Sequence, residues 1–301
     1  MPEGADTVMK FEDVRFTADT VTFTYPFGPR NVIAVGEDMQ AGTLLVRHGD
    51  RLNGAALGLL AGQGIADVKV FRRPRVALLS NGEELVEPGS LRHGSQIYNS
   101  SNMLLMQYIR DCGAEPVYRG IVRDNEALLA ARMAECLDDC DMLVITGGAS
   151  VGDYDFCPRA AARIGAEMIF RKVNYRPGGS MFLAKKDGKL LLSLSGNPAA
   201  AAVTMLLLGQ PALLRLCGRN DLSREVIEVA LAEPFPAPHH PGAMNIIRGH
   251  LVILDGMARL VQNEGRGNGA VLSMRDCNLL GLVPAGSGPL RAGDRIRAVR
   301  V

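Results

Sequence analysis

The sequence predicts an α/β protein: a doubly wound, mostly parallel sheet domain flanked by a small N-terminal β domain and a C-terminal β-barrel-like domain. Three observations lead to this fold class. Between residues 75 and 217, apolar strands alternate with helices, which implies a parallel sheet covered on both faces. Residues 1–46 are rich in Val, Phe, Thr and Tyr between turn residues, as strands are. After residue 222, helical periodicity fades and short strands alternate with turns, which indicates a small all-β domain.

The composition is that of a globular protein. The chain has 301 residues, 47% hydrophobic and 22% charged, which is enough for two or three domains. With a net charge of +1 and no basic stripe, nucleic acid is not an expected partner. No apolar run reaches membrane-spanning length and no signal peptide pattern is present, so we expect a cytoplasmic protein without membrane attachment. Six scattered cysteines without a Cys-x-x-Cys pair favour a reducing compartment over disulfides or zinc.

The N-terminal region is expected to contain a partial β domain over residues 1–46. A helical linker segment follows at 47–72, and within it NGAALGLLAGQ at 53–63 predicts a short helix with too much glycine to be stable alone. The strands expected in the β domain are 8–14, 20–26 and 31–37.

The central α/β domain is expected to span 73–218. Either Asp124 or Asn125 is a plausible N-cap for the second helix. The last two strands are expected to form a hairpin across Asp187-Gly188. The predicted strands are 75–80, 115–122, 141–148, 167–173, 181–186 and 189–195. The predicted helices are 100–113, 125–139, 156–165 and 199–218.

The C-terminal β domain is expected to span 219–301. Its predicted strands are 226–234, 245–254, 258–265, 279–286 and 294–301.

Polar, glycine-rich segments follow three of the central strands. NGEEL begins at residue 81, TGGASVGDYD begins at residue 146, and SGNP spans 195–198. In an open parallel α/β sheet, ligands bind outside the carboxyl ends of the strands. Three such strand exits in one domain therefore predict a ligand site at this edge.

The glycines and the helix start suit a phosphorylated ligand. Glycine lets the backbone approach closely and point N–H groups at anions. The TGGASVG segment offers Gly147, Gly148, Ser150 and Gly152 for this purpose. Ser195-Gly196-Asn197-Pro198 directly precedes a long helix, whose first amides and dipole attract phosphate. A well-capped helix without a ligand is the alternative for SGNP.

The acids at the same strand exits need a different explanation. Glu83, Glu84, Asp153 and Asp155 would repel a phosphate unless a cation lay between them. Because Mg²⁺ prefers one or two carboxylates together with substrate phosphates, these acids predict a nucleotide or pyrophosphate with magnesium. The alternative is that some of the acids only cap helices or face solvent.

Two other polar segments allow two interpretations each. Asn99 and Ser100 precede a helix, either as an N-cap cluster or as ligand-binding residues. Lys172, Arg176 and the RPGGS turn could meet an anion or form a solvated basic strand end.

Two segments outside the central domain carry weaker signals. Asp38, in VGEDM, could be a turn residue. His239 and His240 lie in the proline-rich PAPHHPG, which we interpret as a solvated loop rather than a metal site.

The motifs resemble those of the molybdopterin molybdenumtransferase family, which includes the MoeA proteins and the gephyrin E domain. The resemblance covers nearly the whole chain, and TGGASVGDYD followed by SGNP is specific. The motifs that carry it, in family order and spacing, are PEGADTV, VGEDM followed by AG, LLAGQGI, RVALLSNGEEL, QIYNSSN, TGGASVGDYDF, RPGGS, SGNPAAAAVT and LRAGDRIRAV.

The resemblance implies an enzyme of molybdenum cofactor biosynthesis. It implies a magnesium-dependent reaction in which molybdate is inserted into adenylylated molybdopterin and AMP is released. It also implies an elongated homodimer with the site near the subunit interface. Further partners implied are a molybdopterin adenylyltransferase and molybdoenzymes or their chaperones.

The resemblance also assigns residues. Glu84 and Asp155 match the family's essential acids, and Asp38 matches another acid, from the smaller domain. In this picture Glu84, Asp153 and Asp155 hold Mg²⁺, and the segment from Ser195 to Pro198 binds ligand at the last helix. The pterin nucleotide lies on the α/β domain. Molybdate, a tetrahedral oxyanion, needs donors such as Ser150, Arg176 or backbone amides.

The chain departs from the family pattern at several motifs. The usual TGDEL reads NGEEL, with Asn81 and Glu83 in place of a hydroxyl and a shorter acid. The usual YDSN reads YNSS, so that Asn99 replaces an acid, and LPGNP reads LSGNP. The usual KPGKP reads RPGGS, with one lysine and one proline fewer. The family also has a further N-terminal segment before PEGAD, which completes the β domain and the dimer arm.

Two functions follow from the motifs together with their departures. One is the enzyme just described. The other is a noncatalytic paralogue that binds molybdopterin or a nucleotide, or acts as a scaffold. An adenylyltransferase is disfavoured because such proteins share the α/β domain but not the flanking β domains.

Overall fold

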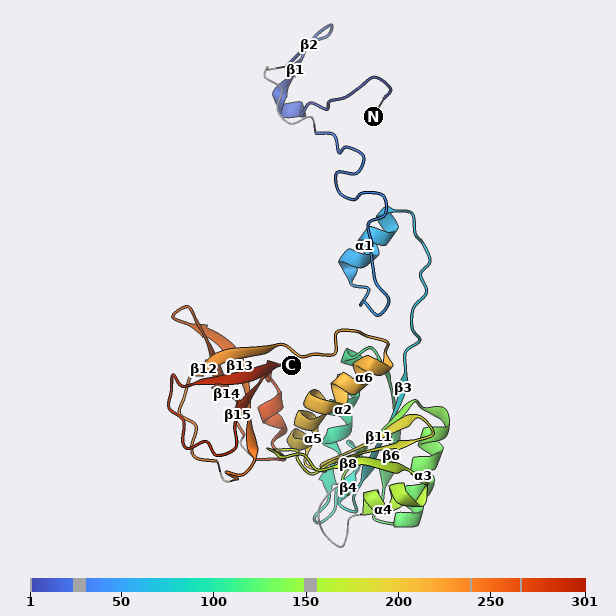
Figure 1. Ribbon diagram of the computed structural model, residues 1–301, viewed down its shortest axis with the longest axis vertical. Helices are drawn as coiled ribbons and strands as arrows, with labels where there is room; N and C mark the ends of the chain where they lie inside the picture. The colour runs from blue at the N-terminus through green and yellow to red at the C-terminus, as the bar shows by residue number, and fades with distance from the viewer. Residues whose placement is uncertain (1, 24–30, 149–155, 239, 266) are drawn as a thin grey trace. The chain divides into compact units, whose positions relative to one another are not determined.

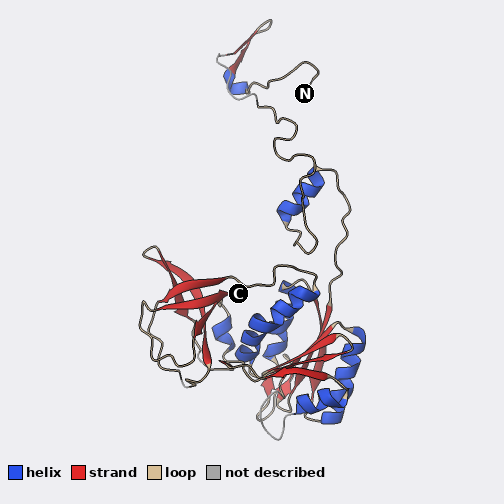
Figure 2. Ribbon diagram, viewed as in Figure 1, coloured by secondary structure: helices blue, strands red, loops and turns tan. Residues whose placement is uncertain are grey.

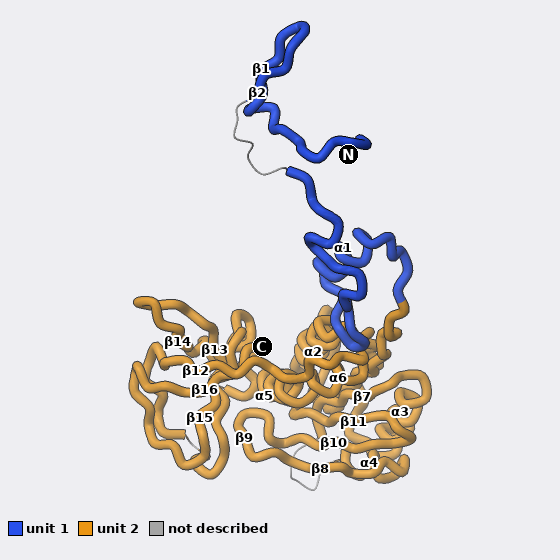
Figure 3. Tube along the Cα trace, turned by 45° about the horizontal axis from the view of Figure 1, so that its top comes forward, with its two compact units in different colours: residues 1–68 blue, residues 69–301 orange. Residues whose placement is uncertain are grey.

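A computed structural model describes residues 2–23, 31–148, 156–238, 240–265 and 267–301 (Figure 1). The chain divides into two compact units, Met1–Val68 and Lys69–Val301, which Figure 3 shows in different colours. Each unit is considered separately below.

The first unit contains little regular structure. A 3-10 helix, Phe11–Asp13, leads into an antiparallel hairpin of β1 (Val14–Phe16) and β2 (Val21–Phe23). Helix α1 (Gly54–Gly62) begins as predicted, and the side chain of Asn53 accepts a hydrogen bond from the Ala56 amide at 2.9 Å.

Two strand predictions in this unit are wrong. Most of the segment expected as a strand at 8–14 is irregular or 3-10 helical, and the strand begins only at Val14. Residues 31–37 form a turn, closed by the Glu37 amide on the Ala34 carbonyl at 3.0 Å, rather than a strand. A β-rich composition gives a strand only where a partner strand is available, and no strand pairs with 31–37 in the described part of the chain.

The second unit is built on a six-stranded sheet with the order β6-β3-β7-β11-β10-β8. Neighbours among β6, β3, β7 and β11 are parallel, and β10 is antiparallel to both β11 and β8. The predicted mostly parallel sheet and the 187–188 hairpin are confirmed. The strands are β3 (Arg75–Asn81), β6 (Glu115–Val122), β7 (Met142–Thr146), β8 (Glu167–Arg171), β10 (Phe182–Lys186) and β11 (Lys189–Leu194). A short parallel pair, β4 (Leu85–Val86) and β5 (Ile97–Tyr98), lies outside this sheet.

Helices cover both faces of the sheet (Figure 2). Along β3, Ala77 and Leu79 pack against α3 (Glu126–Asp139) and α4 (Phe156–Arg163). Val76 and Leu78 face the other way, in a core shared with α2 (Ser100–Asp111), α5 (Pro198–Thr204) and α6 (Gln210–Leu216). All four side chains are fully buried, which explains why the strand is apolar from Val76 to Leu79 rather than alternating.

The last helix of the sheet domain is continuous from Pro198 to Leu216 and contains a π-helical turn at Met205–Gly209. By length and hydropathy it is the one described helix that could cross a membrane, whereas the sequence analysis expected no such run. Of its apolar window, 61% is buried within the protein, as in the core helix of a globular domain.

The C-terminal strands form a closed barrel. Five strands follow one another in the order β14-β12-β16-β15-β13, and β13 pairs with β14 to close the ring. This confirms the predicted barrel-like domain. The strands are β12 (Val226–Leu231), β13 (Met244–Leu254), β14 (Met257–Gln262), β15 (Leu279–Val283) and β16 (Arg295–Arg300).

The barrel and the sheet domain share a core and a strand pairing. Ala199, Val203 and Leu206 of the long helix pack against Ile246 and Leu280 of the barrel. In addition, β9 (Tyr175–Arg176), from the segment after β8, pairs in parallel with the start of β13. The RPGGS turn is therefore held between the two domains.

Candidate functional site

The sheet register brings the three polar strand exits together. Thr146 at the end of β7 is aligned with Ser80 of β3 on one side and with Leu194 of β11 on the other. The Gly147 amide donates to the Leu194 carbonyl at 3.2 Å. The NGEEL, TGG and SGNP segments consequently leave the sheet side by side, as the sequence predicted for one edge.

Gly147 and Gly148 lie where a side chain would not fit. Both have positive φ, 88° and 61°. A Cβ on Gly147 would lie 2.0 Å from the Asn81 carbonyl oxygen, and a Cβ on Gly148 would lie 2.6 Å from the Cys157 Sγ. Asn81 is itself fixed, because its Nδ2 donates to the Val122 carbonyl at 3.0 Å. The two glycines are therefore required by the close packing of the strand exits, and their approach to an anion stays a prediction.

The continuation of this loop is not part of the described chain. Ser150, Gly152, Asp153 and Asp155, which we expected to bind anion and magnesium, lie outside the described residues.

The two neighbouring glutamates of NGEEL are in different surroundings. The Glu83 carboxylate accepts from the Arg123 guanidinium at 2.7 Å and from the Asp124 amide at 3.1 Å. The hydrogen bond from Arg123 lowers the pKa of Glu83 below its usual value. The Glu84 carboxylate has no hydrogen-bond partner among the described residues, and it lies against Gly82, 2.6 Å from where a Cβ would be. Only Glu84 is thus available to a cation or ligand.

A buried polar network lies beneath these exits. Ser80 Oγ accepts from Thr146 Oγ1 at 3.1 Å and from Asn99 Nδ2 at 2.9 Å. Asn99 Nδ2 also reaches the Tyr118 hydroxyl at 3.0 Å, and that hydroxyl donates to Glu87 Oε1 at 2.6 Å. Burial, followed by the bond to Glu87, raises the pKa of Tyr118 to about 12, which keeps the phenol a donor.

Asn99 is 2% exposed and engaged within this network. It occupies the N-cap position of α2, but its side chain makes no capping hydrogen bond. The interpretation of the Asn99 side chain as a helix cap is therefore wrong. Ser100, the first residue of α2, is exposed. The sequence analysis missed Tyr118 and Glu87; the available signal was the buried hydroxyl of Ser80 in an apolar strand, which requires a partner.

The SGNP segment begins the long helix as predicted. Pro198 is its first residue, and Ser195 Oγ accepts from the Asn197 amide at 3.2 Å. The Ala200 amide donates to the Asn268 carbonyl at 3.1 Å. One first-turn amide that the sequence analysis offered to phosphate is therefore already used by the C-terminal domain.

The RPGGS turn lies at the same edge of the sheet. Because β8 and β11 are each antiparallel to β10, they run in the same direction, and Lys172 follows the carboxyl end of β8. Thr204 Oγ1 of α5 donates to the Gly178 carbonyl at 2.9 Å. Lys172 has a φ of 64°, which is uncommon for a lysine and fixes the direction in which its side chain leaves the turn.

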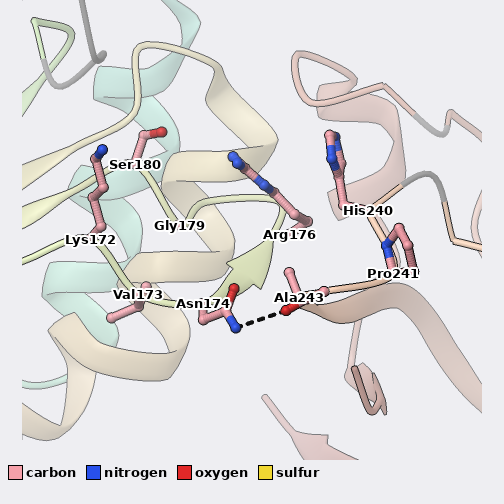
Figure 4. Close-up of a pocket in the computed structure, with 10 residues that line it drawn as sticks. Lys172, Val173, Asn174, Arg176, Gly179, Ser180, His240, Pro241 and Ala243 are labelled. Atoms are coloured by element: carbon pink, nitrogen blue, oxygen red, sulfur yellow. Dashed lines mark hydrogen bonds between the residues drawn. The ribbon is translucent and has the colours of Figure 1, made fainter. Parts of the chain in front are cut away.

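A pocket of about 560 Å³ opens beside this turn. In Figure 4 the side chains of Lys172, Arg176, Ser180 and His240 extend toward the same side of it. Its walls are Lys172, Val173, Asn174, Arg176, Gly179 and Ser180 from the turn and His240, Pro241, Gly242 and Ala243 from the barrel. The sequence analysis interpreted PAPHHPG as a solvated loop, so it missed the place of His240 in this wall. Arg176 and His240 also border a cavity of about 270 Å³ that includes Arg248 and Asn268.

The geometry described above includes neither Asp38 nor a complete metal site. Asp38 is exposed in a bend of the first unit. No group of three or more His, Cys, Asp or Glu side chains is arranged to hold a metal ion in the part of the chain that the structure describes. A magnesium site at this edge would therefore combine Glu84 with the acids beyond residue 148.

Known proteins resemble this chain along nearly its whole length. Residues 77–215 match the family model described as a probable molybdopterin binding domain, and residues 1–64 match the MoeA N-terminal region, domains I and II. A Staphylococcus aureus molybdopterin molybdenumtransferase is 30% identical over 298 residues, covering 98% of this chain and 70% of the relative. The Staphylococcus epidermidis protein of the same name is 29% identical over 300 residues, covering 99% and 71%.

Solved structures agree with these relatives. The molybdopterin biosynthesis MoeA protein from Pyrococcus horikoshii superimposes with a TM-score of 0.76 at 28% identity, covering 98% of this chain and 72% of that one. The chain therefore belongs to the molybdopterin molybdenumtransferase (MoeA) family of molybdenum cofactor biosynthesis.

Proposed function

We propose that the protein inserts molybdate into adenylylated molybdopterin in a magnesium-dependent reaction that releases AMP. The observation that carries the proposal is the convergence of three strand exits at one edge of the sheet. There an available carboxylate, a tight glycine turn and a helix start lie together, and the cationic RPGGS turn follows a strand that ends at the same edge. These features suit a phosphorylated ligand bearing a cation.

The proposed substrate-binding residues surround that edge. Gly147, Gly148, Ser150 and Gly152 offer amides and a hydroxyl to phosphate oxygens, and Lys172 and Arg176 offer positive charge. Ser195, Gly196, Asn197 and Pro198 bind ligand at the start of the helix. Asn99 acts from the buried network, where it orients its neighbours, and Ser100 is exposed beside it.

The proposed magnesium ligands are Glu84, Asp153 and Asp155. The fit rests on Glu84, whose carboxylate has no hydrogen-bond partner among the described residues, unlike that of Glu83. When bound, Mg²⁺ supplies positive charge that offsets the charge of the phosphoanhydride oxygens. The catalytic acids proposed are Glu84 and Asp155, together with Asp38 from the smaller domain.

The assembly belongs to the proposal as well. We propose a homodimer in the cytoplasm, built from domains at 1–46, 73–218 and 219–301 joined by a helical linker at 47–72. Its further partners are a molybdopterin adenylyltransferase, which supplies the nucleotide, and the molybdoenzymes or chaperones that receive the product.

A single-turnover assay with adenylylated molybdopterin, Mg²⁺ and molybdate tests the reaction by following AMP. We expect AMP release that requires molybdate and is lost in Asp155→Ala. Tight binding of the nucleotide without AMP release would overturn the catalytic assignment.

The second candidate, a noncatalytic pterin- or nucleotide-binding paralogue, is favoured by two observations. Asn99 replaces the family's acid and is hydrogen-bonded to Ser80 and Tyr118 in the buried network, and the RPGGS turn has one lysine fewer than the family pattern. Binding without turnover in the assay above would support it.

A further inference from the structure

The pocket beside the RPGGS turn has the chemistry of a site for a small anion. Two basic side chains, Lys172 and Arg176, line it together with the Ser180 hydroxyl and the Asn174 amide. No carboxylate is among the described residues that form its walls. Clustered cations and neutral donors without an opposing acid attract a compact, multiply charged oxyanion.

The turn itself has no room for another side chain. A Cβ on Gly179 would lie 2.4 Å from the Val173 carbonyl oxygen and 2.5 Å from the Tyr175 carbonyl oxygen. Both are backbone atoms that cannot rotate away. The lysine that the family pattern carries at this position is therefore incompatible with the turn in this chain, and any further donor or charge must come from another segment.

His240 is the side chain that the barrel contributes to the same pocket. Its carbonyl accepts from the Ala243 amide at 3.1 Å, and the Pro241 carbonyl accepts from the Gly286 amide at 2.7 Å. This turn is also attached to the cationic segment, because Asn174 Nδ2 donates to the Gly242 carbonyl at 2.9 Å (Figure 4). In addition, the Met244 amide donates to the Asn174 carbonyl at 3.1 Å. The backbone that carries the imidazole is thus held beside the pocket before any ligand arrives, which lowers the cost of binding.

We propose that His240 binds a tetrahedral oxyanion together with Lys172, Arg176 and Ser180, and that it takes over the part of the lysine that Gly179 excludes. The chemical class is a tetrahedral dianion of the size of molybdate. That molybdate is its physiological occupant rests on the proposed function. The imidazole donates an N–H to one oxygen of the anion, while the Lys172 and Arg176 side chains neutralise its charge.

Direct binding tests the proposal without requiring turnover. Calorimetric titration of the full chain with molybdate, tungstate and phosphate is compared for wild type, His240→Ala, His240→Lys and His93→Ala. His93 is an exposed histidine outside the pocket and is the matched control. Losing one charge-assisted hydrogen bond weakens binding by about tenfold or more, so we expect His240→Ala to bind molybdate about tenfold or more weakly than wild type. We expect His240→Lys to bind within about threefold of wild type, since it restores a cationic donor.

Unchanged affinity in His240→Ala, or failure of wild type to bind any of the three anions, overturns the proposal. Failure of His240→Lys to recover binding would make the role of His240 structural, and would overturn it as well. The AMP-release assay separates this outcome from the proposed function. If wild type binds the oxyanion through His240 but releases no AMP, the oxyanion site is supported and the proposed reaction is overturned. If His240→Ala releases AMP at the wild-type rate, the reaction is supported and the role of His240 is overturned.

Discussion

At the scale of single residues, two adjacent glutamates have different environments. Glu83 is paired with Arg123, whereas the Glu84 carboxylate has no hydrogen-bond partner among the described residues. We predict that Glu84→Gln lowers the rate of AMP release by about a hundredfold or more, because it removes a charge from the proposed magnesium site. Glu83→Gln is the matched control and should stay within about tenfold of wild type. Single-turnover rates over a range of Mg²⁺ concentrations measure both, and equal losses would contradict the assignment.

Asp141, at the start of β7, anchors the segment that leads into the sheet. Its carboxylate accepts from Arg72 Nη1 and from the Arg75 amide, both at 2.7 Å, and the bond from Arg72 lowers the pKa of Asp141. We predict that Asp141→Ala lowers the free energy of unfolding by about 2 kcal/mol at pH 7, mainly through the bond to the Arg75 amide.

The sign of the pH dependence follows from the lowered pKa of Asp141. The unfolded chain binds this proton more readily than the folded chain, so the contribution is present above about pH 4 and is lost as the pH falls below it. Urea unfolding at pH 7 and pH 3 should therefore show a smaller difference between wild type and Asp141→Ala at pH 3 than at pH 7. Asp276→Ala is the control, since the Asp276 side chain is 61% exposed and, among the described residues, its ion pair is with its neighbour Arg275. A difference that persists undiminished at pH 3 would contradict the role of the charge.

Sequence reasoning located the strand-exit residues but not their supporting partners. The sequence predicts Glu84 and Gly147 at the same edge of the sheet because the carboxyl ends of parallel strands lie at one edge. Tyr118 and His240 could not, because each acts through a contact with a segment distant in the sequence. A tyrosine within a strand and a histidine in a proline-rich loop have no local signature that indicates their contacts.

At the scale of elements, prediction succeeded where the local pattern and the burial agree. β3 is apolar from Val76 to Leu79 because Ala77 and Val76 face different helices, and both faces of the sheet are covered. It failed for 31–37, where the composition suits a strand but no strand pairs with it in the described chain. The pairing of β9 with β13 was also missed, since two residues are too short to show any periodicity.

The glycine turn after β7 allows steric clash to be separated from backbone strain. Gly147 and Gly188 both have positive φ, 88° and 82°, but only at Gly147 would a Cβ meet another atom, the Asn81 oxygen at 2.0 Å. We predict that Gly188→Ala costs about 1–2 kcal/mol of unfolding free energy and that Gly147→Ala costs more than about 3 kcal/mol. Denaturant unfolding of the two variants measures the difference, and equal losses would show that the turn can move away from Asn81.

At the scale of the whole molecule, the two units differ in how well they bury their apolar side chains. The second unit has continuous cores in the sheet domain and in the barrel. In the first unit, Phe16, Val21 and Val35 are 56%, 58% and 107% exposed. An isolated two-stranded hairpin is at best marginally stable in water, so this unit requires a surface to cover its apolar side chains.

We predict that a second copy of the chain provides that surface. The double variant Phe16→Ser, Val21→Ser should weaken the dimer by about a hundredfold or more, since each side chain contributes about 1.5–3 kcal/mol when buried. Thr22→Ala, on the same exposed strand, removes no large apolar group and is the control. Sedimentation velocity across micromolar concentrations measures the change. Because the second unit has its own cores, its thermal unfolding should be unaltered in the double variant, so a dimer lost together with that unfolding transition would indicate general misfolding. A wild type that is monomeric throughout the concentration range would contradict the prediction. The exposed side chains of the hairpin would then be covered by a different protein.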